Sequence, residues 1–359
     1  MEHVAIDLGS RKSQVCVRAA DGTIVLERAV PTLLIADFLA PRAPCRVILE
    51  TCAEAFAVAD AIHRANPAHE LRIVPATLAP TLGVGARRSK SDLRDARALS
   101  NASTRVDLGS VHIKSPQARA ALTLGVSRDA LVRSRTLLIN CVRGWGRQHL
   151  VRPKNGASTA FPDRMRAATQ VAGLELPAEI SSLLEVIDTL TDHERALSKK
   201  TDEQAKKHPL CKLLRTAPIG ACTAVAFVAT VDDISRFPFA HALEAYLGLT
   251  PGEDSSAERQ RTTGITKAGS ARLRWLLVQS CWSAVNRRPE DPLVRWTIAL
   301  ALRRGWKIAI TAMARKLAGI LWAMWRYNKP YDPSRAASVT PTALAPMPPR
   351  AMELDSTHC

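Results

Sequence analysis

The chain has 359 residues, 47% of them hydrophobic, and 50 Lys and Arg against 33 Asp and Glu give a formal net charge of +17. This length predicts two or three domains, and the hydrophobic content excludes a disordered chain, because disorder needs low hydrophobicity together with high charge. The longest uncharged apolar run, residues 218–231, is shorter than the roughly 20 residues of a membrane span, and the N-terminus has no signal-peptide pattern. Eight cysteines without a CxxC pair argue against a zinc site and for a reducing compartment. We therefore expect a cytoplasmic protein.

Positive charge is concentrated in two segments. Residues 111–175 carry 11 basic and 3 acidic side chains, and residues 259–335 carry 16 and 3, whereas residues 1–110 are nearly neutral. Clustered positive charge is typical of a polyanion site, because phosphates that are neutralised release their condensed counterions. A nucleic acid is the expected partner, and a charged surface without a partner is the alternative.

The first hundred residues are predicted to form an α/β domain. The pattern predicts five strands, at residues 3–8, 13–18, 23–30, 45–49 and 71–74. Asp21-Gly22 marks a hairpin turn, and helices are expected over residues 32–39 and 54–66. Hairpin-linked strands followed by alternating helix and strand are the order of a ribonuclease-H-like sheet and also of the actin-like ATPase fold.

From about residue 115 the pattern becomes helical. Apolar spacing predicts a helix over residues 116–149, and the amphipathic helix over 180–197 is either an oligomerisation coil or a helix packed on its own domain. Residues 151–172, rich in Pro and Gly, are expected to be a loop or joint. A second helical domain is expected to extend to about residue 331.

Four carboxylates occupy positions from which they could converge. Asp7 and Glu50 each end a predicted strand, and the spacing of Asp92 and Asp95 places both on one face of a helix. Two Mg²⁺ ions about 4 Å apart need such a cluster of hard oxygen ligands. Taken singly, each acid has an ordinary alternative as a turn-forming or surface residue. We find no second glycine-rich phosphate loop downstream, which favours a nuclease-type site over an ATPase.

A second candidate site follows residue 248. Ser255 and Ser256 lie in a turn-rich loop that precedes a basic, glycine-punctuated stretch. A serine there could attack a phosphate while Lys and Arg side chains stabilise the negative charge. Solvated loop serines are the ordinary alternative, since no histidine base is near in sequence. Six of the seven tryptophans lie in the same basic segment, where they either stack on bases or pack in the core.

Five motifs follow one another along the chain: Ile6-Asp7-Leu8-Gly9, Leu49-Glu50, Lys90-Ser91-Asp92-Leu93-Arg94-Asp95-Ala96, Ala217-Pro218-Ile219-Gly220 and Ile265-Thr266-Lys267-Ala268-Gly269-Ser270. In this order they resemble the DEDD transposases of the IS110 insertion-sequence family, the recombinases guided by a bridge RNA. The resemblance spans residues 3–333.

The resemblance implies an α/β plus α architecture. A RuvC-like DEDD domain would occupy residues 1–110, a helical linker with a possible coiled coil 111–208, a mainly helical transposase domain 209–332 and a disordered tail 333–359. Asp7, Glu50, Asp92 and Asp95 would be the catalytic acids and the ligands of Mg²⁺. Ser256 would be the nucleophile that forms a covalent link to DNA, with Ala257 standing where the family has a glycine.

The expected partners are donor and target DNA, a bridge-type noncoding RNA and further copies of the chain in a dimer or tetramer. The protein would act at the nucleoid of a bacterium. We expect nucleic-acid contacts from Arg133, Arg135, Arg143, Arg261, Lys267, Arg272 and Arg274. The rival functions are a Mg²⁺-dependent nuclease or junction resolvase that uses only the acids, a non-catalytic nucleic-acid-binding protein and an actin-like ATPase.

Overall fold

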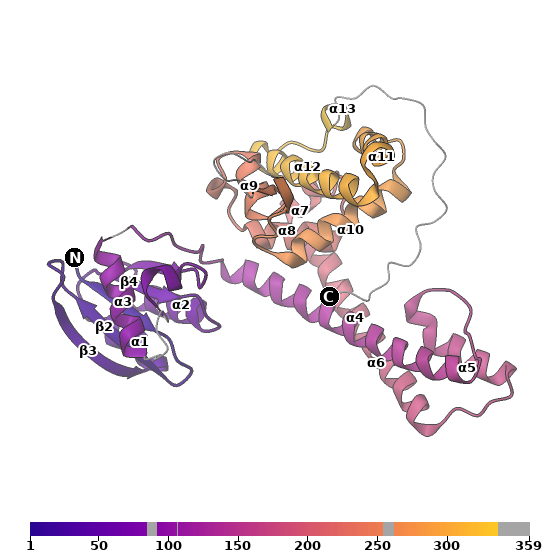
Figure 1. Ribbon diagram of the computed structural model, residues 1–359, viewed down its shortest axis with the longest axis horizontal. Helices are drawn as coiled ribbons and strands as arrows, with labels where there is room; N and C mark the ends of the chain where they lie inside the picture. Colours follow the sequence, from indigo (N-terminus) through magenta and orange to yellow (C-terminus); the bar gives the residue numbers. More distant parts are fainter. Residues whose placement is uncertain (85–91, 106, 254–261, 337–359) are drawn as a thin grey trace. The chain divides into compact units, whose positions relative to one another are not determined.

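The computed structural model describes residues 1–84, 92–105, 107–253 and 262–336. The chain divides into two compact units, Met1–Ser115 and Pro116–Cys359 (Figure 1). Each unit has its own hydrophobic core.

Unit 1 is built on a five-stranded mixed sheet of order β3-β2-β1-β4-β5. Its strands are β1 (His3–Asp7), β2 (Lys12–Arg18), β3 (Ile24–Pro31), β4 (Arg46–Glu50) and β5 (Glu70–Val74). The first three strands pair antiparallel, and β4 is parallel to both β1 and β5. These are the five strands that the sequence predicts, so that prediction is confirmed.

Helices cover both faces of this sheet. They are η1 (Thr32–Leu34), α1 (Ile35–Leu39), α2 (Ala55–Ala65), η2 (Ala79–Leu82) and α3 (Asp92–Arg105). Ile6 and Leu49 belong to the core that the sheet shares with α1 and α2, whereas Ala5 and Ile48 belong to the core shared with η2 and α3. Because successive side chains of a strand point to opposite faces, both strands are buried on both sides, which accounts for their nearly continuous apolar sequence.

Unit 2 begins with two long helices that pack along each other, α4 (Pro116–Gln148) and α6 (Ala178–Lys207). Both were predicted. The short η3 (Ser158–Ala160) and α5 (Phe161–Val171) lie between them in sequence and cover the end of the pair distant from the other helices (Figure 1). The prediction of a loop over residues 151–172 is therefore wrong for its second half. Phe161 and Met165 are one turn apart and fully buried in the core at this end, and Pro162 lies in the first turn, where a missing N–H costs nothing.

The remainder of unit 2 packs around α12. Its helices are α7 (Pro209–Leu214), α8 (Ala221–Val231), η4 (Ile234–Arg236), α9 (Ala240–Tyr246), α10 (Ala271–Arg287), α11 (Pro292–Arg304), α12 (Trp306–Tyr327) and α13 (Pro333–Ala336), and its strands are β6 (Pro251–Glu253) and β7 (Thr262–Ile265). Both α4 and α6 pack against α8. The segment expected as a separate linker thus belongs to the same compact unit, and α6 packs on that unit rather than standing free as a coil. Beyond residue 336 the predicted tail lies outside the described residues.

Within the described ranges, α12 is the one helix long and apolar enough to cross a membrane by length and composition. Its apolar side chains are accounted for by packing, since Met313, Leu317 and Leu321 are fully buried in the core of unit 2. The helix also carries Arg315 and Lys316 in its middle. These features are those of a core helix.

Candidate active site

Asp7 and Glu50 lie at the same edge of the sheet. Each is the last residue of its strand, and the parallel pairing of β1 with β4 sets Ile6 opposite Leu49, directly before the two acids. Strand alternation gives Asp7 the face of Ala5 and Glu50 the face of Ile48. That face is the one covered by α3.

Asp95 lies on α3 at the level of Asp7. The helix is anchored at its other end, where the imidazole Nδ1 of His3 lies 2.6 Å from the hydroxyl oxygen of Ser103. From Ser103 back to Asp95 a helix advances about 12 Å, and from His3 to Asp7 a strand advances about 13 Å. The Asp95 side chain is only 5% exposed and shares the sheet-facing side of α3 with Leu99 and Ala102. Three of the four predicted acids thus share one end and one face of the sheet.

Asp92 differs from the other acids in its exposure. It is the first residue of α3, one turn beyond Asp95, and its side chain is exposed to solvent. Asp92 is therefore exposed and Asp95 buried, although their spacing in sequence predicts that both lie on one face of the helix.

The loops that follow the two strands are fixed by local contacts. A Cβ on Gly9 would lie 2.3 Å from the carbonyl oxygen of Lys12, so only glycine fits there. The Thr32 hydroxyl donates to the Gly9 carbonyl at 2.6 Å and lies 2.8 Å from the Ser13 hydroxyl. After β4, Thr51 donates both its N–H and its hydroxyl to the carbonyl of Val74. These contacts hold the backbone just beyond each acid.

The donor chemistry of this edge fits a divalent cation. Carboxylate oxygens are the ligands that Mg²⁺ prefers, and a carboxylate as buried as Asp95 needs compensating charge or hydrogen bonds. Among the residues that the structure describes, however, no three His, Cys, Asp or Glu side chains are gathered closely enough to hold one ion. Placement and residue type fit a metal, and a closed ligand shell is not formed.

The predicted nucleophile falls outside the described residues. Ser255, Ser256 and Arg261 all lie in 254–261, between β6 and β7. Both ends of that segment are placed, because β6 and β7 pair antiparallel with Glu253 opposite Thr262. The chain therefore leaves and returns at neighbouring points of unit 2.

The glycines on either side of this hairpin allow a close backbone contact. Gly248 and Gly269 both have positive φ. A Cβ on Gly248 would lie about 2 Å from the backbone of Ala268, and a Cβ on Gly269 would lie about 2 Å from the backbone of Tyr246, so only glycine fits at either position. Arg274 donates to the carbonyls of Leu247 and Ala268 and closes the same contact. Burial lowers the pKa of Arg274. The motif around Gly269 thus fixes the base of the hairpin, and Arg274 has a positioning role.

Three of the predicted nucleic-acid contacts have internal partners. Arg135 is 6% exposed and forms an ion pair with Glu194 of α6 at 3.5 Å, so the expectation that it contacts RNA is wrong: its position on α4 faces α6. Arg272 is half-buried and pairs with Asp129 of α4 at 2.5 Å. Like Arg274, it holds elements together. Pairing across α4, α6 and α10 depends on the tertiary arrangement, which the charge pattern does not contain.

Of the remaining predicted contacts, the three that the structure describes are exposed. Arg133 and Arg143 project from α4, and the Arg143 guanidinium lies over the Phe161 ring, 5.4 Å from its centroid. Lys267 is exposed and has a positive φ of 57°. These three side chains are accessible to a phosphate.

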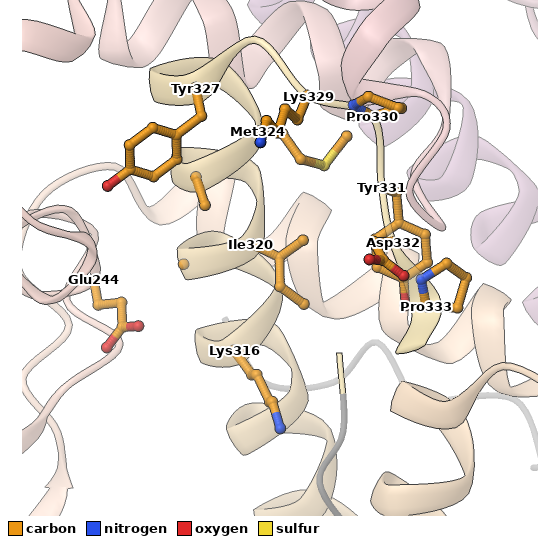
Figure 2. Close-up of a pocket in the computed structure, with 12 residues that line it drawn as sticks. Glu244, Lys316, Ile320, Met324, Tyr327, Lys329, Pro330, Tyr331, Asp332 and Pro333 are labelled. Atoms are coloured by element: carbon orange, nitrogen blue, oxygen red, sulfur yellow. The ribbon is translucent and has the colours of Figure 1, made fainter. Parts of the chain in front are cut away.

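A hollow of about 830 Å³ lies beside α12. Figure 2 shows Lys316, Ile320 and Tyr327 on this helix, with Glu244 on one side and residues 330–333 on the other. Three of its ionisable groups already have partners. Glu244 pairs with Arg315 at 2.7 Å, the Lys316 ammonium lies over the Trp296 ring, and the Tyr331 hydroxyl donates to Asp291. Burial raises the pKa of Tyr331, so this hydroxyl is a poor nucleophile. The hollow holds no counterpart of the acidic edge.

Acids at the carboxyl ends of neighbouring strands, together with a basic helical unit, are typical of an enzyme that acts on nucleic acid. Residues 4–148 match the family model of the DEDD transposases of IS110, described as Transposase, and residues 211–294 match Transposase IS116/IS110/IS902 family. The chain belongs to this family of insertion-sequence transposases. The resemblance inferred from the motifs is thereby confirmed.

Relatives named as transposases match most of the chain. A probable family 20 transposase of Pseudomonas aeruginosa is 29% identical over 93% of this chain and 99% of its own length. The transposase for insertion sequence element IS1111A of Coxiella burnetii is 30% identical over 68% of this chain and 69% of its own. The transposase for insertion sequence element IS1328 of Yersinia enterocolitica is 27% identical over 89% of this chain and 96% of its own length.

Sequence reasoning missed a group of side chains around Trp275. It treated the tryptophans of the basic segment alike, whereas this one is 55% exposed beside a groove that also contains Arg287 and Arg288. The sequence signal that could have found this group is spacing: Trp275 lies four residues before Gln279 and twelve before Arg287, which places the three side chains on one side of a helix.

Proposed function

We propose that this transposase cuts and rejoins DNA through a serine–DNA link, with the acidic sheet edge of a RuvC-like unit 1 as its metal-dependent centre and Ser256 as its nucleophile. The observation that carries the proposal is the common placement of Asp7, Glu50 and Asp95 at one end and one face of the sheet. Membership of a transposase family supports DNA as the substrate.

Asp7, Glu50 and Asp95 would hold Mg²⁺, with exposed Asp92 as the fourth ligand. When bound, the ion would stabilise charge on the reacting phosphate oxygens. The chain itself orients the carboxylates: Gly9, Thr32 and Thr51 fix the backbone beyond the strands, and the contact of His3 with Ser103 sets the position of α3 along β1.

Ser256 would attack the phosphorus of a DNA phosphodiester. A bond forms between its Oγ and phosphorus, the bond to one sugar oxygen breaks, and the proton that the serine hydroxyl loses ends on that leaving oxygen. The reverse step by the hydroxyl of another strand releases the serine and needs no ATP, because the phosphoserine ester retains the energy of the phosphodiester. The close contacts at Gly248 and Gly269 bring together the chain before and after the segment that contains this serine.

The acids are tested by single isosteric substitutions. Asp7→Asn, Glu50→Gln and Asp95→Asn should each lower strand exchange by several orders of magnitude and weaken Mg²⁺ or Mn²⁺ binding measured by calorimetry. Asp107→Asn, which changes an acid of the same unit with a side chain that is 80% exposed, is the matched control. Normal recombination by Asp95→Asn would contradict the assignment.

The serine is tested by the covalent adduct. Labelled DNA should remain attached to the denatured wild-type chain and to Ser255→Ala, and should be absent from Ser256→Ala. If only Ser255→Ala lost the adduct, the nucleophile would be Ser255 instead of Ser256. Metal-dependent cleavage without any adduct would instead support a nuclease that uses only the acids.

We further propose that target choice depends on a structured RNA bound by the basic surfaces. The support is the exposed charge of Arg133, Arg143 and Lys267, since backbone contacts suffice where base pairing provides the sequence specificity. Donor and target DNA would recombine on a dimer or tetramer at the bacterial nucleoid. The test mixes the purified chain with both DNAs, with and without RNA transcribed from the flank of the element. Efficient site-specific recombination without RNA would overturn this part.

A further inference from the structure

Trp275 stands apart from the other tryptophans of the basic segment. Trp322 is buried, and Trp282, Trp296, Trp306 and Trp325 pack against the core of unit 2. Trp275, on α10, is 55% exposed. A large aromatic ring left in solvent on a basic surface has the properties of a contact residue rather than of a core residue.

Trp275 borders a groove of about 400 Å³ between α10 and the start of α8. These two helices pack against each other (Figure 1). The other wall is formed by the turn at Pro218 and Gly220 that leads into α8. Three arginines line this groove, and none of the described residues lining it is acidic. The groove is therefore apolar at one wall and positive overall.

Four of the side chains that line the groove follow one ridge of α10. Trp275, Gln279, Ser283 and Arg287 are spaced by four residues, so their side chains form a continuous row on the helix surface. The row spans about 18 Å along the helix axis. It begins with an aromatic ring and ends with a guanidinium.

The positive charge at the end of this row is not neutralised within the described residues. Arg287 and Arg288 have no acidic partner there, and the Arg288 guanidinium donates to the carbonyl of Thr216 at 3.3 Å. The nearest acids in sequence have other partners: Glu290 pairs with Arg295, and Asp291 accepts from the Tyr331 hydroxyl. The third arginine of the groove, Arg128, is offset by Glu194 at 2.7 Å.

The beginning of α8 adds partial positive charge. Its N-cap is Gly220, which has no side chain to accept from the first N–H groups of the helix. Such groups favour an anion. Gly220, Cys222 and Thr223, at this end of α8, line the same groove as Arg287 and Arg288.

We propose that this groove binds an unpaired segment of nucleic acid, with a base stacked on Trp275 and the adjoining phosphates held by Arg287 and Arg288. An exposed ring can stack on any base, because every base has a π-face. A duplex presents only base edges and phosphates to a protein, so the ring favours an unpaired strand. The inference goes beyond the acids, Ser256 and guide-RNA binding, and uses none of them.

The test measures binding of the full-length protein to labelled oligonucleotides. The probes are a single-stranded oligo-dT, the matching oligo-U and a hairpin duplex. Trp275→Ala should weaken binding of the single strands about 5- to 150-fold, the range measured for loss of one stacking contact, and leave duplex affinity nearly unchanged. Trp275→Phe, which keeps a ring, should retain most of the affinity. The side chain is exposed, so folding should be preserved, which circular dichroism checks.

The arginines are tested with a control of equal charge. The double variant Arg287→Gln with Arg288→Gln should reduce the slope of log affinity against log salt concentration by about 1.4 for single strands. Combined with Trp275→Ala, it should weaken single-strand binding little beyond the effect of Trp275→Ala alone. Arg303→Gln with Arg304→Gln, exposed on α11 in the same basic segment, should lower binding of single strands and duplex alike.

The DNA and RNA probes identify the occupant: the strand that binds more tightly through Trp275 is the one that the groove takes. Equal effects of Trp275→Ala on single strands and duplex, or no effect on either, would overturn the proposal. Covalent adduct formation by Ser256 is scored separately, so failure of this inference and failure of the proposed mechanism give different results.

Discussion

Arg133 and Arg135 lie two residues apart on α4, yet they have opposite surroundings. Arg133 is exposed, whereas Arg135 is buried between α4 and α6, near Glu194 and the hydroxyl of Thr191. Arg128 and the Ser198 hydroxyl also contact Glu194. A buried carboxylate therefore has two guanidinium partners, and the pair of long helices depends on them.

We expect Arg135→Ala to destabilise the protein by about 3–5 kcal/mol, because removing one partner leaves a buried charge with poorer compensation. Arg133→Ala should change the unfolding free energy by less than about 0.5 kcal/mol. Urea unfolding followed by helical circular dichroism measures both. Similar stability of the two variants would contradict the buried role of Arg135.

Glu194 should make stability pH-dependent. Burial would raise its pKa, but the Ser198 hydroxyl and the charges of Arg128 and Arg135 together lower the pKa below its usual value. A carboxyl with a lowered folded pKa contributes stability above its unfolded pKa of about 4.3 and loses it as the pH falls through the folded pKa.

Glu194→Gln should therefore be less stable than the wild type at neutral pH, and the difference should shrink in acid, where the wild-type carboxyl is protonated too. Thermal melts from about pH 7 to pH 3 follow this trend. A difference that stays constant over that range would refute it.

At the scale of one element, α4 combines exposed and enclosed positions within a single turn. A Cβ on Gly144 would meet no atom within 4 Å, whereas a Cβ on Gly146 would lie 2.7 Å from the buried Met165 methyl and 3.0 Å from the Val151 carbonyl oxygen. The first glycine is a helix position without a packing constraint. The second is required by the contact of α4 with α5.

Gly144→Ala should stabilise the protein by about 0.5–1 kcal/mol, because alanine loses less entropy in a helix. Gly146→Ala should destabilise it by about 1–3 kcal/mol through overpacking. Melting temperatures of the two variants decide the matter, and equal shifts of the same sign would show that the end of α4 packs differently.

At the scale of the whole molecule, two separate cores divide the chain. Leu49 is fully buried between the sheet, α1 and α2, and Leu317 is fully buried on α12. The two cores belong to different compact units, Met1–Ser115 and Pro116–Cys359. Units with their own cores unfold in their own transitions.

Calorimetry should therefore resolve two unfolding transitions. Leu49→Ala should lower the unfolding free energy of unit 1, and Leu317→Ala that of unit 2. Each loss should be about 2–5 kcal/mol, because contacts are lost and a cavity is left behind. A single transition lowered equally by both substitutions would show that the chain unfolds as one cooperative unit.

The sequence alone determined the features that depend on local pattern. Alternation and turn residues predict all five strands of unit 1, and helical spacing predicts α4 and α6, because each pattern reflects a period of the backbone itself. The ordered motifs sufficed for the family, which the family models confirm. The individual roles of the predicted acids and of Ser256 stay predictions.

Tertiary structure decided what depends on residues distant in sequence. Pairing of β1 with β4 and anchoring of α3 at His3 place Asp95, rather than Asp92, on the sheet-facing side of α3 at the level of Asp7. Phe161 forms part of a helix because a core receives it, although its neighbours in sequence favour a loop. Arg135 is buried and Trp275 exposed for the same reason: the surroundings of a side chain are set by which elements pack against its own, and a linear pattern of charge and aromaticity does not contain that information.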